Sequence, residues 1–459
     1  MSRTYSRARA VRTLLAAASV TSALVTAQAR ATPSLEGWAL MPANTAAVGP
    51  TSGQFAITDS SRPYLPLLDA QPVQGFSAVL PGSWPGTFHV MPDNGFGTQG
   101  NSADALLRIY SVKPEWKRWN GSRVVGAGTV SPVAFFFGPL PLKTFSPASF
   151  ISLRDPDHKL TFPIQAELAN YYGLSTNPAV DPSIKAGRLL TGADLDIESV
   201  RRDWRGNLWF GDEFGPFLIK TDATGKVLRA EFPLPNARPA GSTSTGALVQ
   251  SPQNPFLAGA TPNLNGSNGF EGMALNASRT KLYPLLEGSV AGDPAKSLRI
   301  SEFDPSKEAY TGRTLLYALE AQGTNIGDMT AVSDHQFLVI ERNGGTGTSG
   351  TPYKHIFLID IDAVDANGYV QKSDLVDLMN VADPHDLNGD GSALFTFPFV
   401  TIESVLILDP RTLLVINDNN FPGGGGRSTA PDNTEFLRIR LDQPLQAGGQ
   451  THEAEDDAE

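Results

Sequence analysis

Residues 194–215 read DLDIESVRRDWRGNLWFGDEFG, and this stretch decides the expected fold. Its middle, DWRGN at 203–207, favours a tight turn because Gly and Asn tolerate positive φ. The residues on either side then form two strands, and LWFG alternates as in a half-buried strand. Glu198 lies near the start of the first strand, and Asp212 and Glu213 end the second. A hairpin therefore brings the acidic residues to the same end.

The same hairpin pattern recurs along the chain. Copies begin at residues 77, 198, 271, 328 and 403, and their leading and closing positions are 16, 14, 16, 13 and 15 residues apart. In the first copy Ser77 stands where the others begin with an acidic residue. Insertion-rich repeats of this kind are typical of β-propeller blades. Repeated hairpins that serve structure alone are the alternative, because acidic residues are common beside turns.

We therefore expect an all-β protein, a β-propeller of six blades with long insertions between strands and the recurrent hairpins as inner strands. The sixth blade is expected within 101–165 or from pairing of an N-terminal strand with FLRIRL at 436–441. Composition agrees, because 44 Gly and 35 Pro among 459 residues suit a turn-rich β protein. There is no Cys, which excludes disulfides, thiol chemistry and the commonest structural zinc sites.

The N-terminus has the features of a secretory signal peptide. Arginines precede the small and apolar run TLLAAASVTSALVTA, and Ala-x-Ala cleavage patterns follow it. We expect residues 1–31 to be removed, residues 32–442 to form one domain, and the acidic residues 443–459 to be disordered. The protein is then secreted or periplasmic and monomeric, and no later stretch is long and apolar enough to span a membrane.

The charge points to a cation rather than a nucleic acid as partner. The leader holds five of the 36 basic residues and none of the 47 acidic ones, so the charge without it is −16, against −11 for the full chain. Such an acidic protein is not expected to bind nucleic acid.

Convergence of the hairpins would gather many carboxylates at one end of a central channel. Packed carboxylates ionise together only if a cation neutralises them. Oxygen donors without Cys or His favour Ca²⁺, and less strongly Mg²⁺, over zinc or copper. The candidate metal ligands are Asp93, Glu198, Asp212, Glu213, Glu271, Glu287, Glu341, Glu403 and Asp418.

A second calcium candidate is the loop DLNGDGSA. Asp386, Asn388 and Asp390 alternate there as at the start of an EF-hand loop, and Gly391 suits the sharp turn. Phe397 stands where such a loop needs a bidentate Glu, so an Asx-rich turn without an ion is the alternative.

Several of these motifs together resemble a known family. TGADLDIESV with GDEFGPFLIKTDATGKVL, NGFEGMALN with LLEGS, LVIERN, and TIESV with NDNN are similar to the secreted "esterase-like activity of phytase" family, over residues 45–442. The resemblance implies a β-propeller with calcium-dependent phosphoesterase activity. It places functional acids at Glu198, Asp212, Glu213, Glu271, Glu287, Glu341, Glu403 and Asp418, whereas Ser77 departs from the pattern.

The expected function is Ca²⁺-dependent hydrolysis of small-molecule phosphate esters. Metal-bound water would be the nucleophile, and Glu271 or Glu198 the general base. Arg342 could clamp a phosphate, or could form a salt bridge with the acidic ring. Two alternatives are a carboxyl-ester or lactone hydrolase on the same metal and a non-catalytic, calcium-stabilised binding propeller.

Overall fold

Antiparallel sheets built from consecutive strands make up most of the structure, a computed structural model that describes residues 1, 32–56, 64–138, 140–428 and 431–446. All but the first residue of the predicted signal peptide, and most of the predicted C-terminal tail, lie outside the described residues. The chain divides into Met1–Ala31 and Thr32–Glu459, and the described helices and strands belong to the second unit.

Three sheets have four strands each, in chain order. They comprise β11 (Ile197–Arg202), β12 (Leu208–Asp212), β13 (Phe217–Thr221) and β14 (Phe232–Pro233); β15 (Gly272–Leu275), β16 (Leu282–Leu285), β17 (Ser297–Asp304) and β18 (Ala309–Ala318); and β19 (Asn325–Ala331), β20 (Gln336–Arg342), β21 (Lys354–Val364) and β22 (Val370–Asp377).

A larger sheet joins the two ends of the domain. Its path runs through β25 (Ile402–Asp409), β26 (Thr412–Asn417), β27 (Thr434–Arg440), β1 (Ser34–Met41), β9 (Thr129–Pro132), β6 (Arg108–Glu115), β5 (Phe88–Met91) and β4 (Ala78–Pro81). Strands β10 (Phe150–Ser152), β23 (Val381–Ala382) and β24 (Leu394–Phe395) attach at its sides. The remaining elements are β2 (Ala46–Val48) with β3 (Ala70–Pro72), β7 (Arg118–Trp119) with β8 (Val124–Val125), the 3₁₀ helix η1 (Gln165–Glu167) and α1 (Pro182–Gly187).

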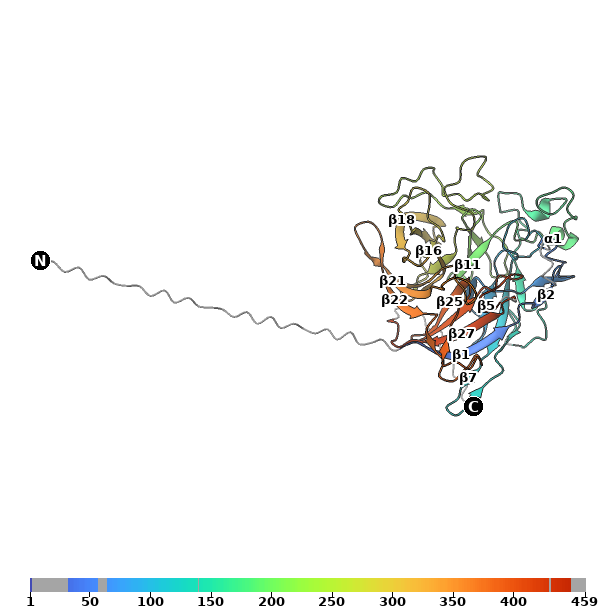
Figure 1. Ribbon diagram of the computed structural model, residues 1–459. Coiled ribbons are helices and arrows are strands. Elements are labelled where there is room, and N and C mark those ends of the chain that lie inside the picture. The colour runs from blue at the N-terminus through green and yellow to red at the C-terminus, as the bar shows by residue number, and fades with distance from the viewer. Residues whose placement is uncertain (2–31, 57–63, 139, 429–430, 447–459) are drawn as a thin grey trace. The chain divides into compact units, whose positions relative to one another are not determined.

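The first strands of the hairpins form a closed ring. β4 contacts β11, β11 contacts β15, β15 contacts β19, β19 contacts β25, and β25 contacts β4 again. In Figure 1 the sheets follow one another around the unit in the same order. A ring of antiparallel sheets with neighbouring inner strands is the arrangement of a β-propeller.

The ring formed by the described residues contains five hairpins, one fewer than the six blades predicted. Residues 101–165 do not form a blade of their own, because β6, β9 and β10 extend the first sheet outward from β5. The N-terminal strand does pair with the C-terminal one, with Trp38 opposite Leu437, but β1 thereby completes the last sheet. Both regions considered for a sixth blade are thus used by the first and last sheets.

Apolar side chains fill the spaces between neighbouring sheets. Trp209 of the β11–β14 sheet and Phe303 of the β15–β18 sheet pack edge to face with ring centroids 5.2 Å apart. Similar clusters lie between the other neighbouring sheets. Close packing of this kind holds the inner strands rigidly, so side chains at their ends have fixed relative positions. No described helix is long and apolar enough to cross a membrane.

Candidate functional site

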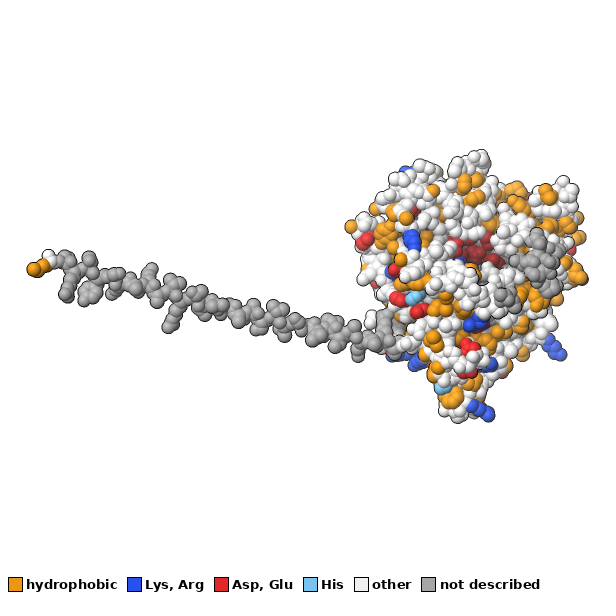
Figure 2. Space-filling view, viewed as in Figure 1, with side chains coloured by type: hydrophobic (Ala, Val, Ile, Leu, Met, Phe, Trp, Pro, Cys, Tyr) orange, Lys and Arg blue, Asp and Glu red, His pale blue; other side chains and the backbone are white. Residues whose placement is uncertain are grey.

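The hairpin registers bring the acidic positions to one end of the ring. Ile197 pairs with Asp212, and Ile402 pairs with Asn417, so Glu198 and Glu403 lie beside the closing residues of their own hairpins. We call this group of side chains the carboxylate mouth. It consists of Asp93, Asp196, Glu198, Asp212, Glu213, Glu271, Glu287, Glu403 and Asp418. Figure 2 shows acidic side chains at the bottom of a hollow near the middle of the folded unit.

Two of the leading acids are bulge residues. In the β11–β12 pair the register shifts between Ile197 and Ser199, which leaves Glu198 as the extra residue. In the β25–β26 pair it shifts between Ile402 and Ser404, and Glu403 is the extra residue. A bulge re-aims the side chain of the inserted residue and is common beside functional sites.

Two subsets of the mouth have spacings that suit metal ions. Oxygens of Asp93, Asp196 and Glu198 lie within 4.8 Å of one another, and so do oxygens of Glu213, Glu271 and Glu287. Buried Oδ1 of Asp196 and Oε1 of Glu213 have no hydrogen-bond partner among the described residues. Buried oxygens without donors, in sets made only of carboxylates, fit a hard cation such as Ca²⁺ or Mg²⁺.

Burial and mutual repulsion raise the pKa values of these carboxyl groups. For Glu271 the main cause is desolvation, followed by the charges of Glu403 and Glu287, and its pKa is well above the ordinary value. Desolvation likewise raises the pKa of Glu198 and of Glu213 well above the ordinary range. Without a cation the mouth therefore holds protons that exposed carboxylates would release near neutral pH.

Arg342 supplies a positive charge inside this group. Its Nη2 lies 3.2 Å from Glu271 Oε1, 3.0 Å from Glu287 Oε1 and 2.8 Å from Glu403 Oε1. Burial alone would lower the pKa of Arg342, but the charges of Glu403, Glu287 and Glu271 outweigh it and raise the pKa. The salt bridge considered from the sequence is therefore present. Nε of Arg342 is buried and has no partner among the described residues.

The first hairpin contributes through Ser77 and Asp93. Ser77 Oγ donates to Glu403 Oε2 at 3.2 Å, so the serine supports an acid of the neighbouring hairpin. Asp93 Oδ1 accepts from Gln74 Nε2 at 3.0 Å and from the backbone N–H of Gly95 at 2.8 Å. At this leading position Ser77 therefore supplies a hydrogen-bond donor where the other hairpins have a negative charge.

Two predicted metal ligands have structural partners of their own. Glu341 does not face the mouth, because its carboxylate accepts from Tyr317 Oη at 2.6 Å, Lys372 Nζ at 2.8 Å and the backbone N–H of Glu320 at 2.7 Å. The geometry therefore does not support Glu341 as a ligand. Asp212 Oδ1 and Oδ2 accept from the backbone N–H groups of Asp196 and Gly215, both at 2.8 Å, so it also stabilises the turn after β12.

The loop of Asp386, Asn388 and Asp390 is an Asx-rich turn. Asp386 Oδ1 accepts from the backbone N–H of Gly391 at 3.0 Å, and Asp390 Oδ1 from that of Ser392 at 2.8 Å. Asn388 Nδ2 donates to Asp390 Oδ2 at 2.8 Å. These side chains bond to the loop's own groups, as an Asx-rich turn without an ion would, and the calcium site at this loop stays a prediction.

Residues outside the predicted set also build the mouth. Asp196 belongs to the group with Asp93 and Glu198 whose spacing suits a metal ion, although only Glu198 was predicted from this strand. Asn268 Nδ2 donates to Glu287 Oε2 at 3.2 Å. The signal for Asp196 was present in the sequence, because Asp196 and Glu198 follow one another at alternate positions in DLDIES.

The raised pKa values predict how pH affects the cation-free protein. Burial raises the pKa of Asp212 from 3.8 to about 7 and that of Glu403 from 4.5 to about 7. A carboxyl group with a higher pKa in the folded state stabilises the fold while protonated. That contribution is complete below pH 4 and is lost as the pH rises to about 7. We expect the Tm of chelator-treated protein to fall over this interval, and added Ca²⁺ to raise Tm most above pH 7. A Tm that rises with pH across the interval would contradict this.

A closed ring of antiparallel hairpins with a buried carboxylate site at one end defines a β-propeller with a candidate cation site. The chain belongs to the phytase-like family described as "esterase-like activity of phytase", whose model matches residues 71–421. This match confirms the resemblance found in the sequence motifs.

Other known proteins are similar to parts of this chain. An uncharacterized secreted protein of Arthroderma benhamiae is 22% identical over 245 residues, which is 49% of this chain and 45% of the relative, so the match spans less than half of that relative's length. A luciferin-regenerating enzyme has a TM-score of 0.35 at 12% identity, covering 91% of this chain and 98% of its own. Regucalcin, a calcium-binding protein from Agrobacterium tumefaciens, has a TM-score of 0.33 at 9% identity, covering 92% and 98%. Because these scores are below 0.5, the fold assignment rests on the strand topology.

Proposed function

We propose that this protein is an exported hydrolase of phosphate esters that depends on Ca²⁺ bound in the carboxylate mouth. The observation that carries the proposal is the buried concentration of carboxylates around one guanidinium, in a member of the phytase-like family. Export is supported by the expected leader at residues 1–31 and by the name of the relative, which is described as secreted.

The two metal-sized groups are the proposed cation ligands. Asp93, Asp196 and Glu198 would hold one ion, and Glu213, Glu271 and Glu287 a second. Ca²⁺ suits these sets better than Mg²⁺, because it accepts irregular oxygen geometry from several strands. Bound Ca²⁺ would offset the repulsion among the carboxylates, hold phosphate oxygens and polarise the ester.

Residues of the chain itself would move the proton and orient the phosphate. Glu271 and Glu198 are the proposed proton acceptors from water. Both carboxylates belong to the mouth, and burial together with the charges of neighbouring acids raises the pKa of each, the main neighbouring charge being Glu403 for Glu271 and Glu271 for Glu198. Arg342 orients Glu271 through Nη2, and its unpartnered Nε is the group proposed to donate to a phosphate oxygen.

Hydrolysis of nitrophenyl phosphate, bis-nitrophenyl phosphate and nitrophenyl acetate by chelator-treated protein tests the proposal. We expect turnover of at least one phosphate ester to appear only when Ca²⁺ is added back. Preference for the acetate would favour the carboxyl-ester hydrolase, and an increase in Tm with Ca²⁺ but no turnover would favour the binding propeller. Turnover of phosphate esters that is equal with and without Ca²⁺ would overturn the metal dependence.

A further inference from the structure

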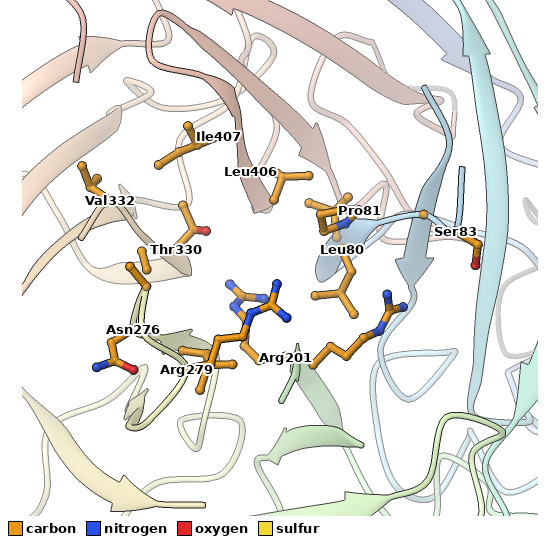
Figure 3. Close-up of a pocket in the computed structure, with 16 residues that line it drawn as sticks. Leu80, Pro81, Ser83, Arg201, Asn276, Arg279, Thr330, Val332, Leu406 and Ile407 are labelled. Atoms are coloured by element: carbon orange, nitrogen blue, oxygen red, sulfur yellow. The ribbon is translucent and has the colours of Figure 1, made fainter. Parts of the chain in front are cut away.

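Two of the cavities formed by the described residues lie near opposite ends of the inner strands. The first, of about 390 Å³, is lined by the last residues of β4, β11, β15 and β19 and by residues of β25. In Figure 3 Leu80, Arg201 and Thr330, from three different inner strands, lie around this cavity. Because the acids of the mouth are at the beginnings of these strands, this cavity is too far from the mouth to hold part of the same ligand.

The second cavity adjoins the carboxylate mouth, and we call it the side cavity. Its volume is about 360 Å³, which is within the range of small-molecule sites. Asp194 lines it, and two residues of chain span at most about 7 Å, so this wall is close to Asp196 of the mouth. Gln99, from the loop after Asp93, lines it too and donates through Nε2 to the carbonyl of Ala193 at 3.0 Å.

The wall formed by residues 252–255 is attached to the turn that carries another acid of the mouth. The backbone N–H of Ser251 donates to the carbonyl of Gly215 at 3.2 Å, and Asn254 Nδ2 donates to the same carbonyl at 2.7 Å. Gly215 follows Glu213 by two residues. The side cavity is therefore built on the chain segments that supply acids to both metal-sized groups.

Aromatic side chains and prolines form the apolar surface of the side cavity. Phe162 lines it and stacks on Phe217, with ring centroids 5.9 Å apart, and Phe217 pairs with Asp212 of the mouth across β12 and β13. Leu168 and Tyr172 line it at the surface, where they are 38% and 39% exposed, and three prolines also line it. Flat apolar walls of this kind suit an aromatic ring.

The charges of the side cavity exclude the phosphate group as its occupant. None of its lining residues, all of them described, is basic. Its one acidic lining residue, Asp194, is already hydrogen-bonded, because Oδ1 accepts from the backbone N–H of Gln165 at 2.6 Å and Oδ2 from that of Thr191 at 2.8 Å. The side cavity therefore suits a neutral group.

One glutamine supplies the hydrogen-bonding capacity that remains. Gln99 and Gln165 bond to backbone groups of the protein, whereas the buried Oε1 of Gln253 has no partner among the described residues. A Cβ atom at Gly266 would lie 2.8 Å from Gln253 Nε2, so glycine there leaves room for this amide. Since the last torsion of a glutamine side chain is broad, the amide can turn toward a polar group of a ligand.

We propose that the side cavity binds the alcohol part of the phosphate ester, and that this part is a neutral aromatic group. Its ring would lie against Phe162 and Tyr172, and a polar substituent would bond to the amide of Gln253. The inference rests on the proposed phosphate ester hydrolysis. In that reaction the oxygen of water forms a bond to phosphorus, the bond between phosphorus and the alcohol oxygen breaks, and the released alcohol takes one proton of the water.

The ratio of kcat/KM for benzyl phosphate to that for ethyl phosphate tests the inference in the presence of Ca²⁺. Because the two alcohols have similar acidity, the ratio reports the binding of the ring. We expect it to be about 10–100, as for burial of one aromatic side chain, and to fall about tenfold in Tyr172→Ala. Trp204→Ala is the matched control, because Trp204 is 62% exposed and does not line the cavity. A ratio near one, or a ratio unchanged in Tyr172→Ala, would overturn the inference.

Binding of benzyl alcohol to chelator-treated protein separates this inference from the proposed function. Saturation-transfer NMR should detect binding, which for so small a ligand is expected in the millimolar range and should weaken in Tyr172→Ala. At least one of 3- and 4-hydroxybenzyl alcohol should bind more tightly than benzyl alcohol, and Gln253→Leu should remove that advantage, whereas Gln371→Leu on exposed β22 should keep it.

The combined outcomes distinguish the two claims. Binding of benzyl alcohol that depends on Tyr172, without turnover of any phosphate ester, would overturn the proposed hydrolysis and support an aromatic ligand in the side cavity. Turnover of phosphate esters without binding of benzyl alcohol would leave the proposed function standing and overturn the inference. Absence of both would overturn both.

Discussion

Replacing Arg342 with methionine is expected to lower the free energy of unfolding of the calcium-free protein by about 3–5 kcal/mol near pH 8, the cost of breaking a buried ion pair by removing one partner. Nη2 of Arg342 lies within 3.2 Å of oxygens from Glu271, Glu287 and Glu403. Methionine fills a similar space but leaves these carboxylates without a counter-charge. Urea denaturation of both proteins measures the difference.

The pH and the cation should change the size of this effect. At pH 5 the glutamates can take up protons instead, since burial raises the pKa of Glu403 to about 7, and the loss should be smaller. Added Ca²⁺ should stabilise the Arg342→Met protein more than the unmodified one, because a cation then replaces the missing charge. The second change Glu403→Gln should restore part of the lost stability, since it removes one of the unpaired charges.

Arg313→Met provides the control for charge removal at a surface position. Arg313 is 37% exposed and pairs with Glu302 at 3.2 Å and Asp362 at 3.5 Å. Such exposed pairs contribute at most about 1 kcal/mol, so this variant should be almost as stable as the unmodified protein. Equal stability of Arg342→Met and Arg313→Met at pH 8 without calcium would show that the guanidinium of Arg342 does not stabilise the folded protein.

The sequence was sufficient to predict that the hairpins bring acids together. Strand pairing is set by the turn and by the alternation of apolar residues, both of which are local. Glu198 and Glu403 were therefore found from spacing alone. Contacts between side chains of different hairpins depend on how distant parts of the chain pack together. The contact of Arg342 with Glu403, and that of Ser77 with the same glutamate, depend on ring closure, which local pattern does not encode.

A shift of one position along β20 decides which side chain faces the mouth, Glu341 or Arg342. Successive side chains of a strand point to opposite faces. The hairpin that starts at Asp328 has a leading-to-closing separation of 13, the shortest of the five copies. In the structure Arg342, one position further along, faces the mouth, whereas Glu341 pairs with Lys372 on the other face. The prediction of six blades is not confirmed for a related reason. The sheet to which a strand belongs depends on partners distant in sequence, as for β1 and β27.

Replacing Glu271 with glutamine is expected to lower kcat/KM for the preferred phosphate ester by about 10²–10⁴-fold, the usual contribution of a general base. Glutamine has the same shape but cannot accept the proton. The variant should fold, since glutamine still accepts a hydrogen bond from Arg342, whose Nη2 lies 3.2 Å from Glu271 Oε1. Asp390→Asn, in the exposed Asx-rich turn, is the control and should leave calcium-dependent hydrolysis unchanged.

Calcium titration of the same variant separates the two roles open to Glu271, because it also belongs to the metal-sized group with Glu213 and Glu287. A base that is not a ligand would lose turnover while the calcium affinity stays the same. A ligand would lose affinity as well, and high Ca²⁺ would then restore part of the activity. In that case the proton acceptor would be Glu198, and Glu198→Gln should lose activity at every calcium concentration. Full activity and unchanged calcium affinity in Glu271→Gln would exclude both roles for this residue, since a buried carboxylate among Glu287, Glu403 and Arg342 would then serve only the charge balance of the mouth.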